Sequence, residues 1–185
     1  GKIDFENVKF GYDKDRTIIK DFTAHVKPGQ KVALVGPTGA GKSTMIKLLM
    51  RFYDVNSGAI LVDGHNVKDF NRGELRELFG MVLQDTWLFS GSIKENIRYG
   101  RLNASDDEVI NAAKAAHVHH FIKTLPDGYN MLLNEESSNI SQGQKQLLTI
   151  ARAILADPKI LILDEATSSV DTRTELLIQK AMDNL

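Results

Sequence analysis

The chain has 185 residues, and its 23 basic and 24 acidic side chains give a formal net charge of −1. A content of 42% hydrophobic and 25% charged residues is typical of globular proteins and excludes a disordered or collagen-like chain. The near-neutral charge argues against binding to nucleic acid by bulk electrostatics, and the absence of Cys excludes a disulfide scaffold and thiol catalysis.

The N-terminal residues predict strands. Residues 3–10 and 17–26 are rich in β-branched and aromatic side chains with rough alternation, which favours an antiparallel sheet. Residues 31–35 form a short apolar run of the kind that is buried on both faces of a sheet. Residues 58–67 resemble a hairpin whose turn is Asp63-Gly64, and residues 80–83 form another short strand.

Helical patterns lie between and after these strands. Apolar residues with helical spacing form two stripes, the first at Met45, Leu48, Leu49 and Phe52 and the second at Leu147, Ile150, Ala151 and Ile154. Ser92 precedes Glu95, and Ser105 precedes Glu108, by the three residues of a capping box, which predicts that helices begin there. Residues 174–185 read as a last helix without a Gly C-cap.

These elements predict an α/β fold with a mixed core sheet, an antiparallel β-subdomain at its N-terminal end and an inserted helical lobe. We expect a single domain over 1–185, with about 1–90 and 157–185 in the core and about 91–156 in the lobe. Because the chain starts within a strand-like run and ends in an uncapped helix, we expect it to be part of a longer protein, truncated at its C-terminal end. No apolar stretch approaches the ~18 residues that are needed to cross a membrane.

One glycine-rich segment fits the phosphate-binding pattern G-x-x-x-x-G-K-[ST]. It consists of Gly36, Pro37, Thr38, Gly39, Ala40, Gly41, Lys42 and Ser43, and it lies between an apolar run and a helical stripe. Glycines let successive backbone N–H groups point at phosphate oxygens, and the helix that follows directs its positive end at the same anion. We expect Lys42 to neutralise the β- and γ-phosphates and the Ser43 hydroxyl to bind Mg²⁺.

A second functional motif, which contains two acidic residues, comes later in the chain. Four apolar residues, Ile160 to Leu163, lead directly into Asp164 and Glu165. Ligands bind at the carboxyl ends of strands in a parallel sheet, so Asp164 is placed to hold Mg²⁺ through water. If the strand ends at Asp164, Glu165 turns toward the γ-phosphate and orients or deprotonates a water molecule.

The segment before the second helical stripe has two readings. Ser141 and Gln144 have the spacing of a capping box, which is a structural role. The segment Ser141-Gln142-Gly143-Gln144 is equally compatible with a second phosphate-binding helix N-terminus. The two roles are compatible with each other.

Together these segments resemble the nucleotide-binding domain of the ATP-binding-cassette (ABC) transporters, and specifically of exporters of the multidrug and lipid-flippase type. The glycine-rich segment together with the next residue, Thr44, resembles Walker A (residues 36–44). Residues 140–144 resemble the signature motif, and residues 160–164 resemble Walker B. The resemblance implies that Tyr12 stacks on adenine, that Gln84 is the Q-loop glutamine, which contacts Mg²⁺ and senses the γ-phosphate, and that Glu165 is the catalytic glutamate. It also implies that residues 168–171 form the D-loop.

The exporter type rests on two segments. Residues 84–93 resemble the run after the Q-loop on which helices of the membrane domain dock, and residues 134–138 occupy the place of the cross-talk loop. From the residues alone, Trp87, Leu88 and Phe89 form either an exposed apolar patch or a piece of the core. The resemblance implies a protein at the cytoplasmic face of the cell membrane, as the soluble part of an integral membrane transporter.

The sequence departs from the family pattern at two points. Gln142 replaces the first glycine of the usual Leu-Ser-Gly-Gly-Gln, a variant compatible with bacterial exporters or with one half of a heterodimer. The switch-loop histidine of the family is expected about ten residues beyond Leu185. His117, His119 and His120 suggest a metal site, with His117 and His120 on one helix face, but a solvated helix face is favoured because no carboxylate accompanies them.

The predicted function is that of an ATP-binding and ATP-hydrolysing motor domain of an exporter, with ATP and Mg²⁺ as ligands. Two such domains, identical or different, would face head to tail, so that Ser141, Gln142, Gly143 and Gln144 contact the ATP of the partner. We expect the isolated chain to hydrolyse ATP weakly or not at all. A soluble ABC ATPase of the DNA-repair type is disfavoured, because only 122 residues separate Lys42 from Asp164 (164 − 42) and they show no sustained heptads.

Overall fold

A computed structural model describes residues 1–13, 16–83, 86–134, 139–164 and 171–183. The chain forms two compact units, Gly1–Phe79 and Gly80–Leu185. Each unit has its own set of buried apolar side chains.

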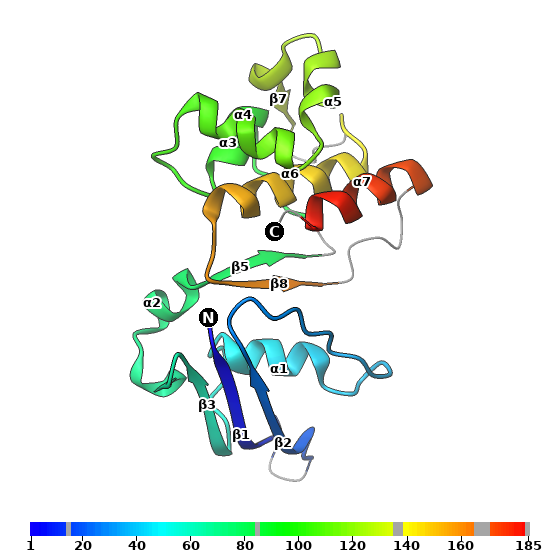
Figure 1. The fold of residues 1–185 in the computed structure, drawn as a ribbon. Helices are drawn as coiled ribbons and strands as arrows, with labels where there is room; N and C mark the ends of the chain where they lie inside the picture. The colour runs from blue at the N-terminus through cyan, green and yellow to red at the C-terminus, as the bar shows by residue number, and fades with distance from the viewer. Residues whose placement is uncertain (14–15, 84–85, 135–138, 165–170, 184–185) are drawn as a thin grey trace. The chain divides into compact units, whose positions relative to one another are not determined.

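The first unit contains a four-stranded antiparallel sheet (Figure 1). In the order β2-β1-β3-β4, its strands are β2 (Ile19–Val26), β1 (Ile3–Phe10), β3 (Ser57–Val62) and β4 (His65–Asn66). The register between β1 and β3 shifts between Glu6 and Lys9, at a bulge where Asn7 has a φ of 47°. A Cβ atom on Gly58 would lie 2.3 Å from the Glu6 carbonyl oxygen, so this close approach requires glycine.

The predicted hairpin over residues 58–67 is confirmed as β3 and β4. Its turn residues Asp63 and Gly64 have φ angles of 49° and 83°. Positive φ at both central positions is the requirement of a type I′ turn, which suits the twist of the two strands. The antiparallel pairing of β1 with β2 is confirmed as well.

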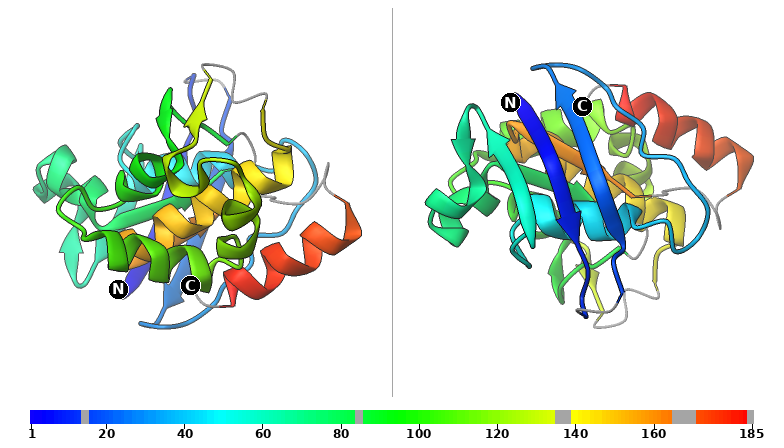
Figure 2. Two further views of the ribbon diagram at one scale, coloured as in Figure 1. Left: turned by 90° about the horizontal axis from the view of Figure 1, so that it is seen from above. Right: turned by 90° about the horizontal axis from the view of Figure 1, so that it is seen from below.

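Helix α1 (Lys42–Leu49) lies against one face of this sheet (Figure 2). It buries Met45, Leu48 and Leu49, three of the four residues of the predicted stripe. The fourth, Phe52, lies beyond the end of the helix and is exposed. The unit is completed by the short helix η1 (Val67–Asp69) and by α2 (Arg72–Glu77), which are capped by the side chains of Asn66 and Asn71.

The expected buried strand over residues 31–35 is wrong for this structure. These residues form no strand, and Val32, Leu34 and Val35 are 52%, 45% and 87% exposed. The described strands of the first unit pair only with one another, and none of them pairs with this run. A run of apolar residues forms a strand only where a neighbouring strand pairs with its backbone N–H and C=O groups.

The second unit is mainly helical. Its helices are α3 (Ile93–Arg98), α4 (Asp106–Ala115), α5 (His119–Thr124), η2 (Gly128–Asn130), α6 (Gln142–Ala156) and α7 (Thr172–Met182). Helix α6 has nine buried residues and packs against α3, α4 and α7 (Figure 2). The apolar side chains of these helices form one continuous core.

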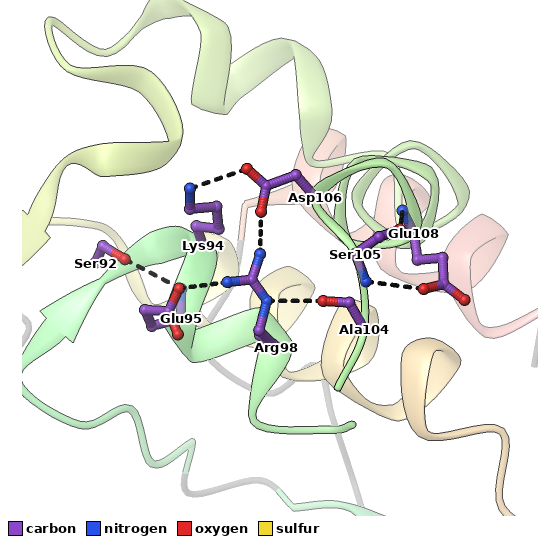
Figure 3. Close-up of polar contacts among 8 residues, drawn as sticks. All are labelled: Ser92, Lys94, Glu95, Arg98, Ala104, Ser105, Asp106 and Glu108. Carbon is purple, nitrogen blue, oxygen red and sulfur yellow. Dashed lines mark hydrogen bonds and ion pairs between the residues drawn. The ribbon is translucent and has the colours of Figure 1, made fainter. Parts of the chain in front are cut away.

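The predicted helix starts at Ser92 and Ser105 are confirmed. The Ser92 hydroxyl accepts from the backbone N–H of Glu95 at the start of α3. At the start of α4, Ser105 and Glu108 form both bonds of a capping box. Figure 3 shows how the Arg98 guanidinium joins the two helices by donating to Glu95, Asp106 and the Ala104 carbonyl.

Two pairs of short strands complete this unit. β5 (Phe79–Val82) and β8 (Ile160–Leu163) lie side by side, and both were predicted (Figure 1). The two-residue strands β6 (Gly91–Ser92) and β7 (Leu132–Leu133) pair antiparallel and were not predicted, because two residues carry no periodicity. Within the described ranges, no helix has the length and apolar character to span a membrane.

Candidate functional site

The glycine-rich segment of the first unit forms a tight curl before α1. The Ala40 amide donates to the Pro37 carbonyl over 3.1 Å, and Gly39 has a φ of 82°. The Lys42 ammonium folds back over the curl and donates to the carbonyls of Gly36 and Pro37 over 2.6 and 3.1 Å. The cation that the sequence assigned to phosphate binding therefore lies over the loop that would hold the phosphates.

The N-terminus of α1 is suited to an anion. Its N-cap is Gly41, at a φ of 93°, and no side chain in the described part of the chain caps its first turn. The first turn has no acidic residue, so the positive end of the helix is not neutralised there. Ser43, the predicted Mg²⁺ ligand, is exposed in this turn.

Tyr12 lies in the same unit, two residues after the end of β1. Its side chain is 44% exposed, and its hydroxyl lies 3.3 Å from Oγ1 of Thr44, with which it shares a hydrogen bond. The structure thus connects the predicted adenine platform to the predicted phosphate-binding helix. This connection could not be predicted from the sequence, since the two residues are 32 positions apart.

In the second unit, the capping reading of residues 141–144 is confirmed. The Ser141 hydroxyl accepts from the Gln144 amide over 3.3 Å, and the Gln144 side-chain oxygen accepts from the Ser141 amide over 2.8 Å. Ser141 is exposed and Gly143 is buried. The Ser141 hydroxyl accepts a bond in the cap, so its own proton can still be donated to a ligand.

The unusual Gln142 contacts its own chain. Its side-chain amide donates to Thr86 Oγ1 over 3.0 Å, which connects the first turn of α6 to the segment before α3. A glycine at this position could not make the contact. The sequence singled out Gln142 as a departure from the family pattern but did not indicate Thr86 as its partner.

The other end of α6 holds the same segment through Arg152. Its guanidinium donates to the Trp87 carbonyl over 3.1 Å and to the backbone and side-chain oxygens of Asn96. Asn96 is 1% exposed, and its side-chain amide donates to the carbonyls of Phe89 and Ser92. Trp87 is 61% exposed while Leu88 is buried. Of the two interpretations of this apolar run, an exposed patch therefore holds for Trp87 and a piece of the core holds for Leu88.

Of the two acidic residues that follow β8, the structure describes Asp164 only. Asp164 follows β8, is exposed, and donates its backbone N–H to the Val82 carbonyl over 2.9 Å. Gln84, Glu165 and residues 168–170 lie outside the described residues, so their predicted roles stay predictions. Asp171 caps α7 by accepting from the Thr174 backbone N–H, and its hydrogen bonds to the side chain and backbone of Thr174 lower the pKa of the Asp171 carboxyl.

The histidine cluster does not form the predicted helix face. His117 lies in the turn before α5 with a φ of 56°, so it shares no helix with His120. His119 Nδ1 lies 2.7 Å from the Tyr129 hydroxyl. Burial lowers the pKa of His119 and raises the pKa of Tyr129 to about 12.

A family model and similar proteins of known sequence point to the same protein family. The family model described as ABC transporter matches residues 19–168. A fatty acid ABC transporter ATP-binding/permease protein of Mycobacterium tuberculosis is 56% identical over the whole chain, and a putative multidrug export ATP-binding/permease protein of Staphylococcus aureus is 52% identical. The chain covers 29% and 32% of these relatives.

A solved structure is similar as well. It is a bacterial Atm1-family ABC exporter with ATP bound, with a TM-score of 0.90 and 46% identity. The match covers 98% of this chain and 32% of the solved chain. This chain thus spans about a third of the length of the proteins that it matches, and its α/β fold is that of their nucleotide-binding region.

Proposed function

The chain belongs to the ABC transporter family, and on that premise we propose that it is the ATP-binding and ATP-hydrolysing motor domain of a membrane exporter. The observation that carries the proposal is the curl over residues 36–41, with the Lys42 ammonium folded across it and the uncapped start of α1 behind it. This geometry offers backbone N–H groups, a helix dipole and a cation to one polyphosphate.

The residues that we assign to nucleotide and metal binding have separate roles toward ATP. Lys42 exchanges its two carbonyl acceptors for the β- and γ-phosphate oxygens, the backbone N–H groups of residues 36–44 bind the remaining oxygens, and Tyr12 stacks on the adenine. Ser43, Gln84 and Asp164 supply the oxygen ligands that Mg²⁺ prefers, the aspartate through water. The metal neutralises phosphate charge when it is bound.

Hydrolysis needs residues of the second unit. Glu165 orients and deprotonates the attacking water, and Gln84 contacts the metal and the γ-phosphate. Ser141, Gln142, Gly143 and Gln144 act on the ATP of a second domain, which faces this one head to tail. One copy therefore holds half of each active site, and the isolated chain binds ATP better than it hydrolyses it.

The proposed partners follow from the same premise. The relatives are named ATP-binding/permease proteins, and this chain covers about a third of their length, which supports a membrane-spanning domain as its partner. We place its docking surface at residues 84–93, where Trp87 is exposed. The domain would then work at the cytoplasmic face of the membrane, with about 1–90 and 157–185 as its core and 91–156 as its helical lobe.

Nucleotide binding to this chain tests the proposal. Titration calorimetry with ATP and Mg²⁺ is expected to give micromolar-to-millimolar affinity, and Lys42→Ala to abolish binding at millimolar nucleotide, because it removes the cation from the phosphate loop. Lys47→Ala is the matched control, since Lys47 lies at the other end of the same helix. Equal affinity in the Lys42→Ala chain would contradict the phosphate-loop assignment.

A further inference from the structure

Three aromatic rings of the first unit, those of Phe10, Tyr12 and Tyr53, contact one another, and Tyr12 is the residue proposed to stack on the adenine. The centroids of Phe10 and Tyr12 are 5.1 Å apart, and those of Tyr12 and Tyr53 are 5.0 Å apart. In both pairs the planes are nearly perpendicular, at 84° and 83°. Edge-to-face contact of this kind is the favoured geometry for aromatic pairs, so two neighbours hold the Tyr12 ring in one orientation.

The three rings differ in exposure. Phe10 is buried at 4% exposure, whereas Tyr12 and Tyr53 are each 44% exposed. Phe10 therefore forms the floor of the cluster, and part of the Tyr12 ring stays accessible to a stacking base. Tyr53 is the exposed neighbour that limits the rotation of Tyr12.

A third contact fixes the far end of Tyr12. Its hydroxyl shares the hydrogen bond with Thr44, which is 8% exposed in the first turn of α1. Thr44 directly follows Ser43, the predicted Mg²⁺ ligand. A hydrogen bond at one end and two rings along its sides leave Tyr12 little rotational freedom.

The backbone that carries Tyr53 is itself held firmly. After α1, Arg51 adopts a φ of 54°, and its side chain donates to Asp54 and to the Phe70 carbonyl. Asn56 forms two hydrogen bonds to the end of β1 and the residue after it. Its backbone N–H donates to the Lys9 carbonyl, and its side-chain oxygen accepts from the backbone N–H of Gly11 over 2.7 Å. Tyr53 and Tyr12 are thus carried by two segments that are bonded to each other.

We infer that Tyr53 is a positioning residue for nucleotide binding, which holds the Tyr12 ring ready to stack on the base while Thr44 ties that ring to the phosphate-binding helix. The inference rests on the proposed function. A ring that is already ordered loses less conformational freedom when the ligand binds, so the benefit appears in the affinity for the base and not for the phosphates.

The test compares ATP with inorganic tripolyphosphate, which has phosphates but no base, in calorimetric titrations of the whole chain. Tyr53→Leu is expected to raise the Kd for ATP about two- to tenfold, the range for loss of an aromatic pair, and to leave the Kd for tripolyphosphate unchanged. Tyr53→Phe keeps the ring and is expected to restore the affinity for ATP. Tyr12→Phe, which loses only the bond to Thr44, is expected to show a smaller change of the same kind.

Phe52→Leu is the matched control, because Phe52 is the adjacent aromatic residue but lies under the Arg76 guanidinium, 4.4 Å from its ring centroid. Its affinity for ATP is expected to be that of the unaltered chain. The inference is overturned if Tyr53→Leu weakens ATP and tripolyphosphate equally, or changes neither. If the unaltered chain binds no ATP, the proposed function fails and the inference fails with it.

Discussion

Two of the residues that the sequence analysis singled out make contacts with distant positions of the chain. Tyr12 bonds to Thr44, and Gln142 bonds to Thr86. The sequence identified Tyr12 and Gln142 by comparison with a family pattern. It could not identify their partners, because a contact between residues 32 or 56 positions apart depends on how the elements pack and leaves no local pattern.

A test at this scale concerns Tyr129. Burial raises its pKa to about 12, whereas an unfolded tyrosine titrates near ~10. The raised folded-state pKa means that its contribution to stability is complete below pH ~10 and is lost as the pH rises toward 12. We expect the tyrosinate absorbance of the folded chain to show a last step near pH 12 that is absent from Tyr129→Phe.

The exposed Tyr99 provides the control for this titration. Tyr99→Phe removes a tyrosine from the same unit and is expected to leave the last step in place. A last step that persists in Tyr129→Phe would assign the raised pKa to another tyrosine. A Tyr129 that titrates near its ordinary value would contradict its burial beside His119.

At the scale of elements, helix starts were the best predicted features. Ser92, Ser105 and Ser141 each begin a helix as the sequence indicated, since a cap is a local interaction over three residues. The run at 31–35 was predicted wrongly because strand formation depends on partners elsewhere. Boundaries also moved: the last helix begins at Thr172, behind an Asp171 cap, rather than at residue 174.

The capping box of α4 gives a quantitative test. Ser105→Ala removes the acceptor for the Glu108 amide and is expected to lower the free energy of unfolding by about 1 kcal/mol. Chemical denaturation monitored by circular dichroism measures the change. Ser90→Ala is the control, because Ser90 is exposed and caps none of the described helices, and a loss of equal size there would contradict the capping role.

At the scale of the whole molecule, the α/β fold and the family were predicted from motif order, and the comparisons bear them out. The motifs were informative because each combines fixed residue types with a fixed spacing. The assembly of the complete catalytic site stays a proposal, because Gln84 and Glu165 lie outside the described residues and the signature is expected to serve a second copy.

The catalytic proposal is tested in the exporter of which we propose this chain to be the motor domain. Glu165→Gln is expected to lower ATP turnover by about 10²- to 10⁴-fold, the effect of losing a general base, while ATP still binds. Steady-state hydrolysis and equilibrium binding are measured on the same preparation. Unchanged turnover would mean that another residue activates the water, or that a different partner chain supplies the active site.

The segment that Gln142 and Arg152 hold against α6 also contains Trp87, the one tryptophan of the sequence. The Arg152 guanidinium lies 5.9 Å from the centroid of its ring, and Tyr99 lies beside it. Indole emission depends on nearby charge and on water, so the tryptophan fluorescence of this chain reports on this one segment. The chain thus carries an intrinsic optical probe at the surface where we place the membrane domain.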